Sequence, residues 1–552
     1  MDDLVKQIEA RHSRAKAERS TADGVFQRIR DLCYPSGDPF MGRETPGTST
    51  RHLVYDNTAE QAADQLAAAL IGSLVNPALD WFGLRAQDAE LNDRDDVKRY
   101  LSVVQGRIRM VTDSPDSRFL LEVHEYLLDF VHYGTGVMFI GDPAGRLPQF
   151  DSRPLSECTL LEGPDGQVDT VFREWQWTAA QAYAKWPEKC GPKVVAAAKD
   201  PNRQEDKFTF LHAVMPREAA PDATAPLVKR LPFASYHVNL TERLMIRESG
   251  YHENPFIASR FSKRTGEVYG RGPGHKALPD VGTLQELSKD IMDAVELGLF
   301  PPLVVDDDGV LGEIRQHSRG LNFARGDAMR RGDPIRRMEI AGVPQLGETY
   351  LQDMRERVTR AYYNHLLQID QDPRMTATQV LELSERTMQA LSSVYGRLQT
   401  EFLGPMIARI YGILTRKPGV LPPPPPILQG RPLKAEFISP AVRQQRLAEV
   451  RAISQSMDVL APLIQTKPEV LDNLDHNAAF RYVFEHMGSP IGLLTSPDEL
   501  KRIRQARQEE AQRQAGMGDL QETLKSVGAV APALQAVVNG AANGQGGGRA
   551  AA

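Results

Sequence analysis

Two segments between residues 268 and 368 repeat apolar side chains at the spacing of an amphipathic helix. In the first segment, which starts at Ala277, the stripe consists of Val281, Leu284, Leu287, Ile291, Val295 and Leu299. In the second segment it consists of Leu351, Met354, Val358, Ala361, Tyr362 and His365. Pro301-Pro302 ends the first helix, because proline lacks an N–H and disfavours helical geometry in the preceding residue. At 1.5 Å per residue each helix is roughly 35–40 Å long. The pattern predicts two long antiparallel helices with a small module between them.

A glycine-rich stretch, 268–276, precedes the first helix. Gly270, Gly272 and Gly274 predict a hinge with backbone angles that other residues do not adopt. A phosphate-cradling loop is the alternative interpretation, but the Gly-Lys-Ser/Thr ending of a P-loop is missing here and elsewhere in the chain. We therefore expect this hinge to join a sheet to the first long helix.

The N-terminal half alternates helical and extended patterns. A charged helix is predicted over 1–33, and Thr58-Ala-Glu-Gln61 matches a capping box that starts a second helix ending near Val75. Gly163-Pro-Asp-Gly166 separates two extended runs, as in a β-hairpin. Further helices are predicted at 95–110 and 118–133, and strands at 80–84, 137–140, 157–162, 167–175, 208–214, 235–238 and 244–248. The fold class is therefore α+β.

After the second long helix comes a short polar loop, 369–375. Thr376-Ala-Thr-Gln379 is a second capping box and opens a helix of nearly forty residues, in which Gly404-Pro405 predicts a kink. A polyproline II connector is predicted at 422–426 and a strand at 434–439 that returns to the earlier sheet. Residues 441–513 have a helical pattern, and the low-complexity stretch 516–552 predicts disorder.

Composition narrows the possible functions. A chain of 552 residues with 41% hydrophobic and 25% charged residues predicts a globular protein of about three to four structural units. The net charge of −6 argues against a tight, nonspecific duplex-DNA binder, which needs an excess of Lys and Arg. The three cysteines have no metal-ligand spacing, and no signal peptide or membrane-length apolar run is evident. We expect the protein in the cytosol or in a particle assembled there, without contact with a membrane.

Candidate chemistry is sparse. Asp306-Asp-Asp308-Gly309 could hold a metal for phosphoryl chemistry, but we favour an acidic turn that leaves a strand, because no partner carboxylate or His motif accompanies the cluster. Gly-x-Ser-x-Gly and His-Glu-x-x-His motifs are absent. We predict no catalytic residue, no metal site and no cofactor.

The module between the long helices is locally basic. Between 315 and 337, seven arginines face two aspartates, a local net charge of +5. The arginines are Arg315, Arg319, Arg325, Arg330, Arg331, Arg336 and Arg337. They form either a solvated surface or a basic rim that meets DNA or an acidic partner.

An ordered series of short motifs resembles the portal, or head-to-tail connector, proteins of short-tailed bacteriophages. In chain order these are Leu66-Ala-Ala-Ala-Leu70, Asn76-Pro77, Trp81-Phe82, Tyr133-Gly-Thr-Gly136, Gly250-Tyr251, Asn254-Pro-Phe256, Val268-Tyr-Gly-Arg-Gly-Pro273, Ala277-Leu-Pro-Asp280, Pro301-Pro302, Thr376-Ala-Thr-Gln379 and, more loosely, Asp475-His-Asn with Arg481. Gln379 stands where many relatives have Glu, and it can still serve the cap.

The resemblance implies a dodecameric ring around a DNA channel at one capsid vertex. It implies a mixed α/β wing at 1–265 and 377–439, stem helices at 266–300 and 344–369, a clip at 301–343, a tunnel loop at 370–376 and a helical crown at 440–515, followed by the tail 516–552. In the tunnel loop, Asp370, Asp372 and Arg374 are candidates for residues that face DNA. Implied partners are double-stranded DNA, the terminase large subunit that hydrolyses ATP and docks at the clip, a tail adaptor, and the major capsid and scaffolding proteins.

Packing within its own chain is the default for one amphipathic helix. Two helices that project from a body cannot bury both stripes by themselves, which favours lateral packing between copies and closes a ring through one repeated interface. Two other classes remain as alternatives: a metal-dependent nucleic-acid-processing enzyme that uses the aspartate cluster, and a virion adaptor without a channel.

Overall fold

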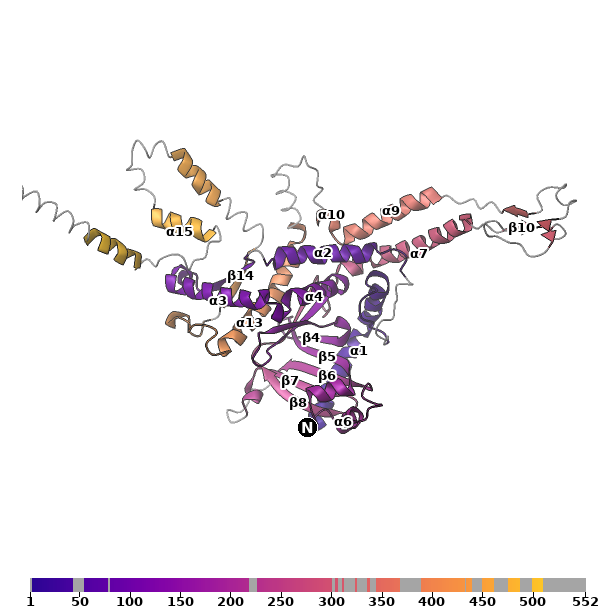
Figure 1. The fold of residues 1–552 in the computed structure, drawn as a ribbon, viewed down its shortest axis with the longest axis horizontal. Helices are drawn as coiled ribbons and strands as arrows, with labels where there is room; N and C mark the ends of the chain where they lie inside the picture. The colour runs from indigo at the N-terminus through magenta and orange to yellow at the C-terminus, as the bar shows by residue number, and fades with distance from the viewer. Residues whose placement is uncertain are drawn as a thin grey trace, which may run out of the picture. The chain divides into compact units, whose positions relative to one another are not determined.

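The computed structural model describes residues 2–42, 54–77, 80–217, 226–299, 344–367, 389–431, 433–438, 449–460, 475–486 and 499–509, with four short strands between 303 and 337. The chain divides into two compact units, Met1–Gln87 with Val103–Glu449 and Asp88–Ser102 with Val450–Ala552. The first unit combines helices and sheets, which confirms the predicted α+β class (Figure 1).

A five-stranded antiparallel sheet is the largest sheet of the first unit. Its strands follow one another in chain order: β4 (Cys158–Glu162), β5 (Val168–Thr178), β6 (Lys207–Pro216), β7 (Phe233–Asn239) and β8 (Leu244–Tyr251). Gly166 has a φ of +71°, and the Gly163 N–H donates to the Gln167 carbonyl over 2.8 Å, so the predicted hairpin turn is confirmed.

Helices cover both faces of this sheet. On one face, α1 (Asp2–Cys33) inserts Val5 and Ile8 among Phe172, Leu211 and Val238. On the other face, α5 (Ala179–Lys185) and α6 (Pro192–Lys199) enclose a core that includes Trp175, Trp186 and Phe210. A capping box starts α5: the Thr178 hydroxyl accepts from the Gln181 N–H, and the Gln181 side chain accepts from the Thr178 N–H. Neither α5 nor α6 was predicted from the sequence.

A second sheet has the strand order β3 (Gln149–Ser152), β2 (Thr135–Gly141) and β9 (Phe256–Arg260), all antiparallel. The long helix α4 (Phe119–Tyr133) packs on it and against the alanine-rich face of α2 (Thr58–Leu74). The capping box predicted at Thr58 is wrong, because Asn57 is the N-cap and makes no side-chain cap. Instead the Thr58 N–H donates to the Asp56 carboxylate over 2.9 Å.

Where the sequence predicted a kink, the structure has a π-helical turn just before Gly404-Pro405. Residues 389–416 run through α12 (Ser392–Arg397), the π-helical segment η6 (Leu398–Leu403) and α13 (Gly404–Arg416). Pro405 lies in the first turn of α13, where its missing N–H is tolerated. The N-terminal part of the predicted helix, including its capping box at 376–379, lies outside the described residues.

The strand predicted at 434–439 is β14 (Leu433–Phe437), and it pairs antiparallel with β1 (Phe82–Ala86). The two strands form a sheet of their own and do not extend either larger sheet. Short 3₁₀ segments lie at Ala89–Asp93, Pro115–Ser117, Leu155–Glu157, Leu227–Arg230 and Pro426–Leu428.

The two predicted long helices are α7 (Pro273–Leu299) and α9 (Pro344–Ala361), which is followed by the short α10 (Asn364–Leu367). They lie side by side in Figure 1. A Cβ on Gly347 would lie 3.0 Å from Ile291 late in α7, and the Lys276 ammonium early in α7 contacts the Tyr363 hydroxyl at 3.1 Å. The helices are therefore antiparallel, as predicted. Between them, β10 (Leu303–Val305) pairs with β13 (Ile335–Arg337), and β11 (Val310–Leu311) pairs with β12 (Phe323–Ala324).

In the second unit the described C-terminal residues are helical, as predicted for 441–513. They comprise 450–460, α15 (His476–His486) and 499–509. Arg481 of α15 lies 3.2 Å from Asp95, the first residue of α3 (Asp95–Asp113), whose first eight residues belong to this unit. None of the helices that the structure describes combines the length and apolar character needed to cross a membrane.

Candidate functional site: the glycine segment and the paired helices

The glycine segment, residues 268–276, is held tightly against the end of α4. A Cβ added to Gly270 would lie 2.1 Å from the Gly134 carbonyl oxygen, and one added to Gly272 would lie 2.4 Å from the Val131 carbonyl oxygen. A Cβ on Gly274 would lie 2.4 Å from the His132 carbonyl oxygen. These are backbone atoms, which cannot turn aside as a flexible side chain can.

The structure therefore gives a different reason for the presence of glycine at these three positions. Gly270, Gly272 and Gly274 are not among the described glycines with positive φ, so unusual backbone angles do not explain them. They permit close approach of two backbone segments, the other physical use of glycine. Gly134 does have a φ of +75° and ends α4. Helix α7 also begins at Pro273, so the last glycine belongs to its first turn.

Hydrogen bonds join the same segment to the second sheet. The Gly270 N–H donates to the Thr135 hydroxyl at 2.8 Å, and the Arg271 N–H donates to the Ser262 carbonyl at 2.8 Å. The Phe261 N–H donates to the Gly134 carbonyl at 2.9 Å. The start of α7 is thus fixed to strands β2 and β9.

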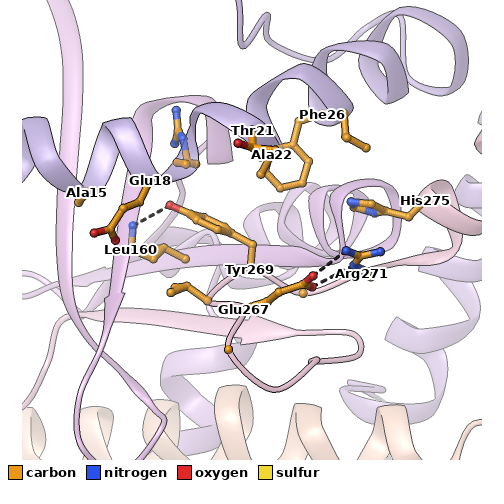
Figure 2. Close-up of a pocket in the computed structure, with 15 residues that line it drawn as sticks. Ala15, Glu18, Thr21, Ala22, Phe26, Leu160, Glu267, Tyr269, Arg271 and His275 are labelled. Atoms are coloured by element: carbon orange, nitrogen blue, oxygen red, sulfur yellow. Dashed lines mark hydrogen bonds and ion pairs between the residues drawn. The ribbon is translucent and has the colours of Figure 1, made fainter.

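Helix α1 closes the other side of the segment, around a cavity of about 480 Å³ (Figure 2). The Phe26 ring packs edge-on against Tyr269 and His275, with centroids 5.9 and 5.6 Å away. The Tyr269 hydroxyl accepts from the Leu160 N–H at 3.0 Å, and Arg271 forms a two-point ion pair with Glu267 at 2.6 and 2.9 Å. The lining combines aromatic rings with polar groups, of which Tyr269, Glu267 and Arg271 have partners within the chain.

Burial determines the protonation states of two titratable side chains in this cavity, His275 and Tyr269. Desolvation, reinforced by Arg271, lowers the pKa of His275 to about 4. Desolvation also raises the pKa of Tyr269 to about 12. Both side chains are therefore neutral near pH 7, and neither is poised for acid–base chemistry there.

A buried polar cluster ties the two long helices to the segment before α2. The Gln285 side chain of α7 accepts from the Tyr55 and Asp56 N–H groups at 2.7 and 2.9 Å and donates to the Asp56 carbonyl at 2.6 Å. From α9, Arg355 reaches the Asp56 carboxylate at 2.8 Å. Burial opposes ionisation of Asp56, but hydrogen bonds from Thr58 and the contact with Arg355 lower its pKa.

The apolar stripes are buried only near the sheets. Val281 and Leu284 of α7 and Val358 of α9 have no exposed surface, and Leu351 and Met354 are buried. Farther along α7, Ile291 is only half-buried. The exposed apolar residues of this distal part are Met292 at 57%, Val295 at 49% and Leu297 at 43%. Met292 and Val295 are three residues apart and lie on one side of α7, whereas Leu297 lies on the opposite side. The described residues leave the side with Met292 and Val295 uncovered.

Most of the other predicted site residues lie outside the described residues: Arg315, Arg319, Arg325, Arg330, Arg331, Asp370, Asp372 and Arg374, together with the Asp306–308 cluster. Arg336 and Arg337 belong to β13. Among the described residues, no group of three or more His, Cys, Asp or Glu side chains is arranged to hold a metal ion. Cys33, Cys158 and Cys190 are buried free thiols.

Sequence reasoning missed Asp56 and Gln285. Gln285 sits among apolar residues on a helix, and a buried Gln usually has a backbone partner, which is a usable signal. Its partner lies 229 residues away, and nothing local in the sequence indicates that distance.

Comparison with known proteins supplies the family. A family model described as bacteriophage head to tail connecting protein matches residues 5–494. The probable portal protein of Bordetella phage BPP-1 is 27% identical over 546 residues, which cover 95% of each chain. The portal protein of Salmonella phage epsilon15 is 26% identical over 518 residues, covering 92% of this chain and 91% of the other. With more than half of its residues matched in order, the chain belongs to the family of bacteriophage head-to-tail connecting proteins.

Proposed function

We propose that copies of this chain form a ring-shaped conduit at one capsid vertex, through which double-stranded DNA is packaged and ejected. The portal proteins named above support this role, since they match nearly the whole chain. The role is structural, and ATP hydrolysis belongs to a separate terminase large subunit. The ring, twelve-fold in the resembled family, also serves as a docking platform for terminase, a tail adaptor, and the major capsid and scaffolding proteins.

The observation that carries the proposal is the uncovered apolar surface of distal α7. A helix of a monomer normally buries its apolar stripe, yet Val295 of the stripe and the adjacent Met292 are exposed while the proximal stripe is buried. A second copy of the same helical pair would cover them. A contact between two different faces of identical chains closes into a ring when its rotation divides a full turn evenly.

The regions take the roles that the resemblance implies. Helices α7 and α9 form the stem (266–300 and 344–369), and the paired short strands belong to the clip (301–343). Residues 1–265 and 377–439 form the wing, and 440–515 the crown. The clip arginines between 315 and 337 are a basic rim, which the ring repeats in every copy. In the tunnel loop, 370–376, the acidic Asp370 and Asp372 repel phosphates and leave Arg374 as the attractive group.

Electron microscopy and mass photometry of the purified full chain test the conduit. A ring with a central hole is expected. Val295→Asp puts a charge into the uncovered stripe and should shift the population from rings toward single chains. Val103→Asp is the matched control, because Val103 is exposed to a similar extent, 45% against 49%, but lies on α3.

A chain that stays monomeric at high concentration, even with capsid and scaffolding proteins supplied, would refute the ring. Equal loss of assembly in both aspartate variants would show that α7 has no special part in the contact. Single chains with nuclease activity would favour the enzyme alternative instead.

A further inference from the structure

A second cavity of the first unit, about 740 Å³ in volume, lies away from the glycine segment, between the two larger sheets and α13. Helices α5 and α6 cover the part of the five-stranded sheet around Trp175 and Phe210. The same face continues to His237 and Arg247, which are paired across β7 and β8 and line the cavity. Phe139 of β2 lines the opposite wall. We name this cavity the inter-sheet cleft.

The inter-sheet cleft is lined mainly by cations. Its basic residues are Arg153, Arg173, Lys185, Arg247, Arg409 and Arg416, against the two acids Asp142 and Asp151. Four of the five arginines have carboxylate partners: Arg173 pairs with Glu157 at 2.7 Å and Arg153 with Asp151 at 2.8 Å, and Arg409 and Arg416 both pair with Glu253. Within the described part of the chain, no carboxylate pairs with Lys185 or Arg247. The cleft therefore offers uncompensated positive charge to a ligand.

Four polar nitrogen atoms in its lining are buried without a hydrogen-bond partner among the described residues. They are Arg153 Nε, Arg409 Nε, His237 Nδ1 and Trp175 Nε1. Arg409 is only 2% exposed, so water does not easily replace the missing acceptor. Native proteins satisfy most buried polar groups. Because these four nitrogens are closed to water, they add polarity to the wall of the cleft, whereas the exposed cations Lys185 and Arg247 are the groups that a ligand can reach.

Electrostatics lead to the same conclusion. Burial lowers the pKa of His237 to about 4, and Arg247, Lys185 and Arg173 lower it further. His212 is stacked on His237 with ring centroids 4.1 Å apart, and burial also lowers its pKa. The histidines stay neutral mainly because they are buried, and the neighbouring cations add to the effect. An oxyanion placed here would relieve that repulsion.

The kind of oxyanion follows from the rest of the lining. Five of the six cations are arginines, whose planar fork fits phosphate oxygens at two points. Aromatic rings from Trp177, Trp186 and Tyr251 line the same cleft. Aromatic rings beside arginines are the surface on which bases of unpaired nucleic acid stack, whereas an acidic peptide needs no such rings. The volume falls in the range of about 300–1,000 Å³ typical of sites that enclose small molecules.

We propose that the inter-sheet cleft binds a phosphate-bearing ligand of nucleotide size, with the phosphate at Lys185 and Arg247 and the base against the neighbouring aromatic rings. The source is either a free nucleotide or an unpaired stretch of a nucleic-acid strand. The site belongs to a single copy of the chain and does not depend on ring formation.

Tryptophan fluorescence gives a direct readout, because three of the four tryptophans of the chain, Trp175, Trp177 and Trp186, line the cleft. The full-length protein is titrated at fixed ionic strength with thymidine monophosphate, short oligothymidylate, duplex DNA, inorganic phosphate and polyglutamate. We expect saturable quenching with the nucleotide or the oligothymidylate, and the stronger of the two identifies the source. Anisotropy of a labelled oligothymidylate checks the affinity independently.

Two exposed cations provide the variants. Lys185→Ala and Arg247→Ala should each weaken binding by about tenfold, as expected for the loss of one charge-assisted hydrogen bond. Lys189→Ala is the matched control, because Lys189 is exposed four residues farther on and does not line the cleft. Near-ultraviolet circular dichroism verifies that each variant is folded.

The proposal is overturned if neither the nucleotide nor the oligothymidylate binds. Equal binding of polyglutamate would reassign the cleft to acidic peptides. A loss of affinity in Lys189→Ala as large as in Lys185→Ala would reduce the effect to general surface charge.

Discussion

Replacing Gly272 by alanine tests whether the glycine segment is a rigid junction. The new methyl group would lie 2.4 Å from the Val131 carbonyl oxygen and 2.9 Å from the Gly134 nitrogen. Normal contacts of this kind exceed 3 Å, so one backbone segment must move away. Insertion of one carbon into a filled interior costs about 1–3 kcal/mol. Because the obstructing atoms belong to the backbone, we expect the upper half of that range.

Gly282→Ala is the matched control within the same helix. A Cβ at Gly282 meets nothing within 4 Å, so the substitution adds only helix propensity. It should stabilise the protein by about 0.5–1 kcal/mol, since glycine in a helix interior loses more backbone entropy than alanine. The two alanine variants are therefore expected to change stability in opposite directions.

Urea unfolding, followed by circular dichroism, measures the stability of both alanine variants. The transition midpoint is the quantity to compare, because a chain with two compact units need not unfold in one step. The midpoint should fall for Gly272→Ala and rise for Gly282→Ala. An unchanged midpoint for Gly272→Ala would show that the junction can open to accept the methyl group. That result would favour the hinge that the sequence predicted over a rigid junction.

Three further predictions concern buried charges. Arg260 is 2% exposed and pairs with Glu162 and Glu401, so Arg260→Met should lower the free energy of unfolding by about 3–5 kcal/mol because two carboxylates lose their shared cation. Urea unfolding of Arg260→Met/Glu401→Gln checks this cause, because the double variant should recover part of the loss. Burial raises the pKa of Asp129 to about 8, so its contribution to the free energy of unfolding is fully present below pH 4 and is lost as the pH rises toward 8. The thermal midpoint of Asp129→Asn should therefore exceed that of the wild type above pH 8, and identical plots of midpoint against pH would contradict this prediction. The pKa of Asp56 is lower in the folded protein than its ordinary value of 3.8, so its contribution to the free energy of unfolding is present above pH 3.8 and is lost as the pH falls through the folded pKa. Asp56→Asn should therefore flatten the acid limb of the plot of thermal midpoint against pH, and an unchanged limb would exclude the ion pair as the source of that limb.

The sequence predicted those parts of the fold in which local pattern and tertiary packing agree. The strands of the five-stranded sheet contain buried apolar runs bounded by turn residues, and the turn at Gly163–Gly166 has the residues that its backbone requires. The long helices α7 and α9 repeat their stripes over several turns. In these elements the periodicity is long enough to identify the structure by itself.

Other elements were missed because their local signal is short or ambiguous. The helices α5 and α6 span only two turns each, and their alanines fit several structures. The strand predicted at 80–84 lies two residues later, at Phe82–Ala86, where pairing with β14 selects the register. At Thr58 the capping motif is present in the sequence, but Asp56 supplies the contact that the motif was expected to make. Only long-range packing decides such cases.

The candidate site, like the fold, has features that the sequence predicts and features that only the tertiary structure reveals. The stripes of the paired helices follow from the sequence, whereas the position at which burial stops does not, because it depends on where α2 and Asp56 meet the pair. The basis for Gly270, Gly272 and Gly274 was likewise hidden: positive φ and close approach both select glycine, and one sequence cannot separate them. The inter-sheet cleft joins residues from Phe139 to Arg416, a combination that no local motif connects.

The two halves of α7 meet different physical demands, and this bears on how a ring could form. The proximal half is fixed three times: by backbone contact with α4, by the hydrogen bonds of Gln285 to Asp56, and by buried apolar contacts. These contacts set the direction of the helix within one chain, before any neighbour is present. The distal half, with Met292 and Val295 exposed, is left to meet whatever lies beside it. Closure of a ring requires the same angle at every interface, and angular errors accumulate from copy to copy. In the proposed ring, a stem that is anchored rigidly at its base limits that error. Tight packing at the glycine segment and an uncovered apolar surface farther out are complementary requirements of that proposed assembly.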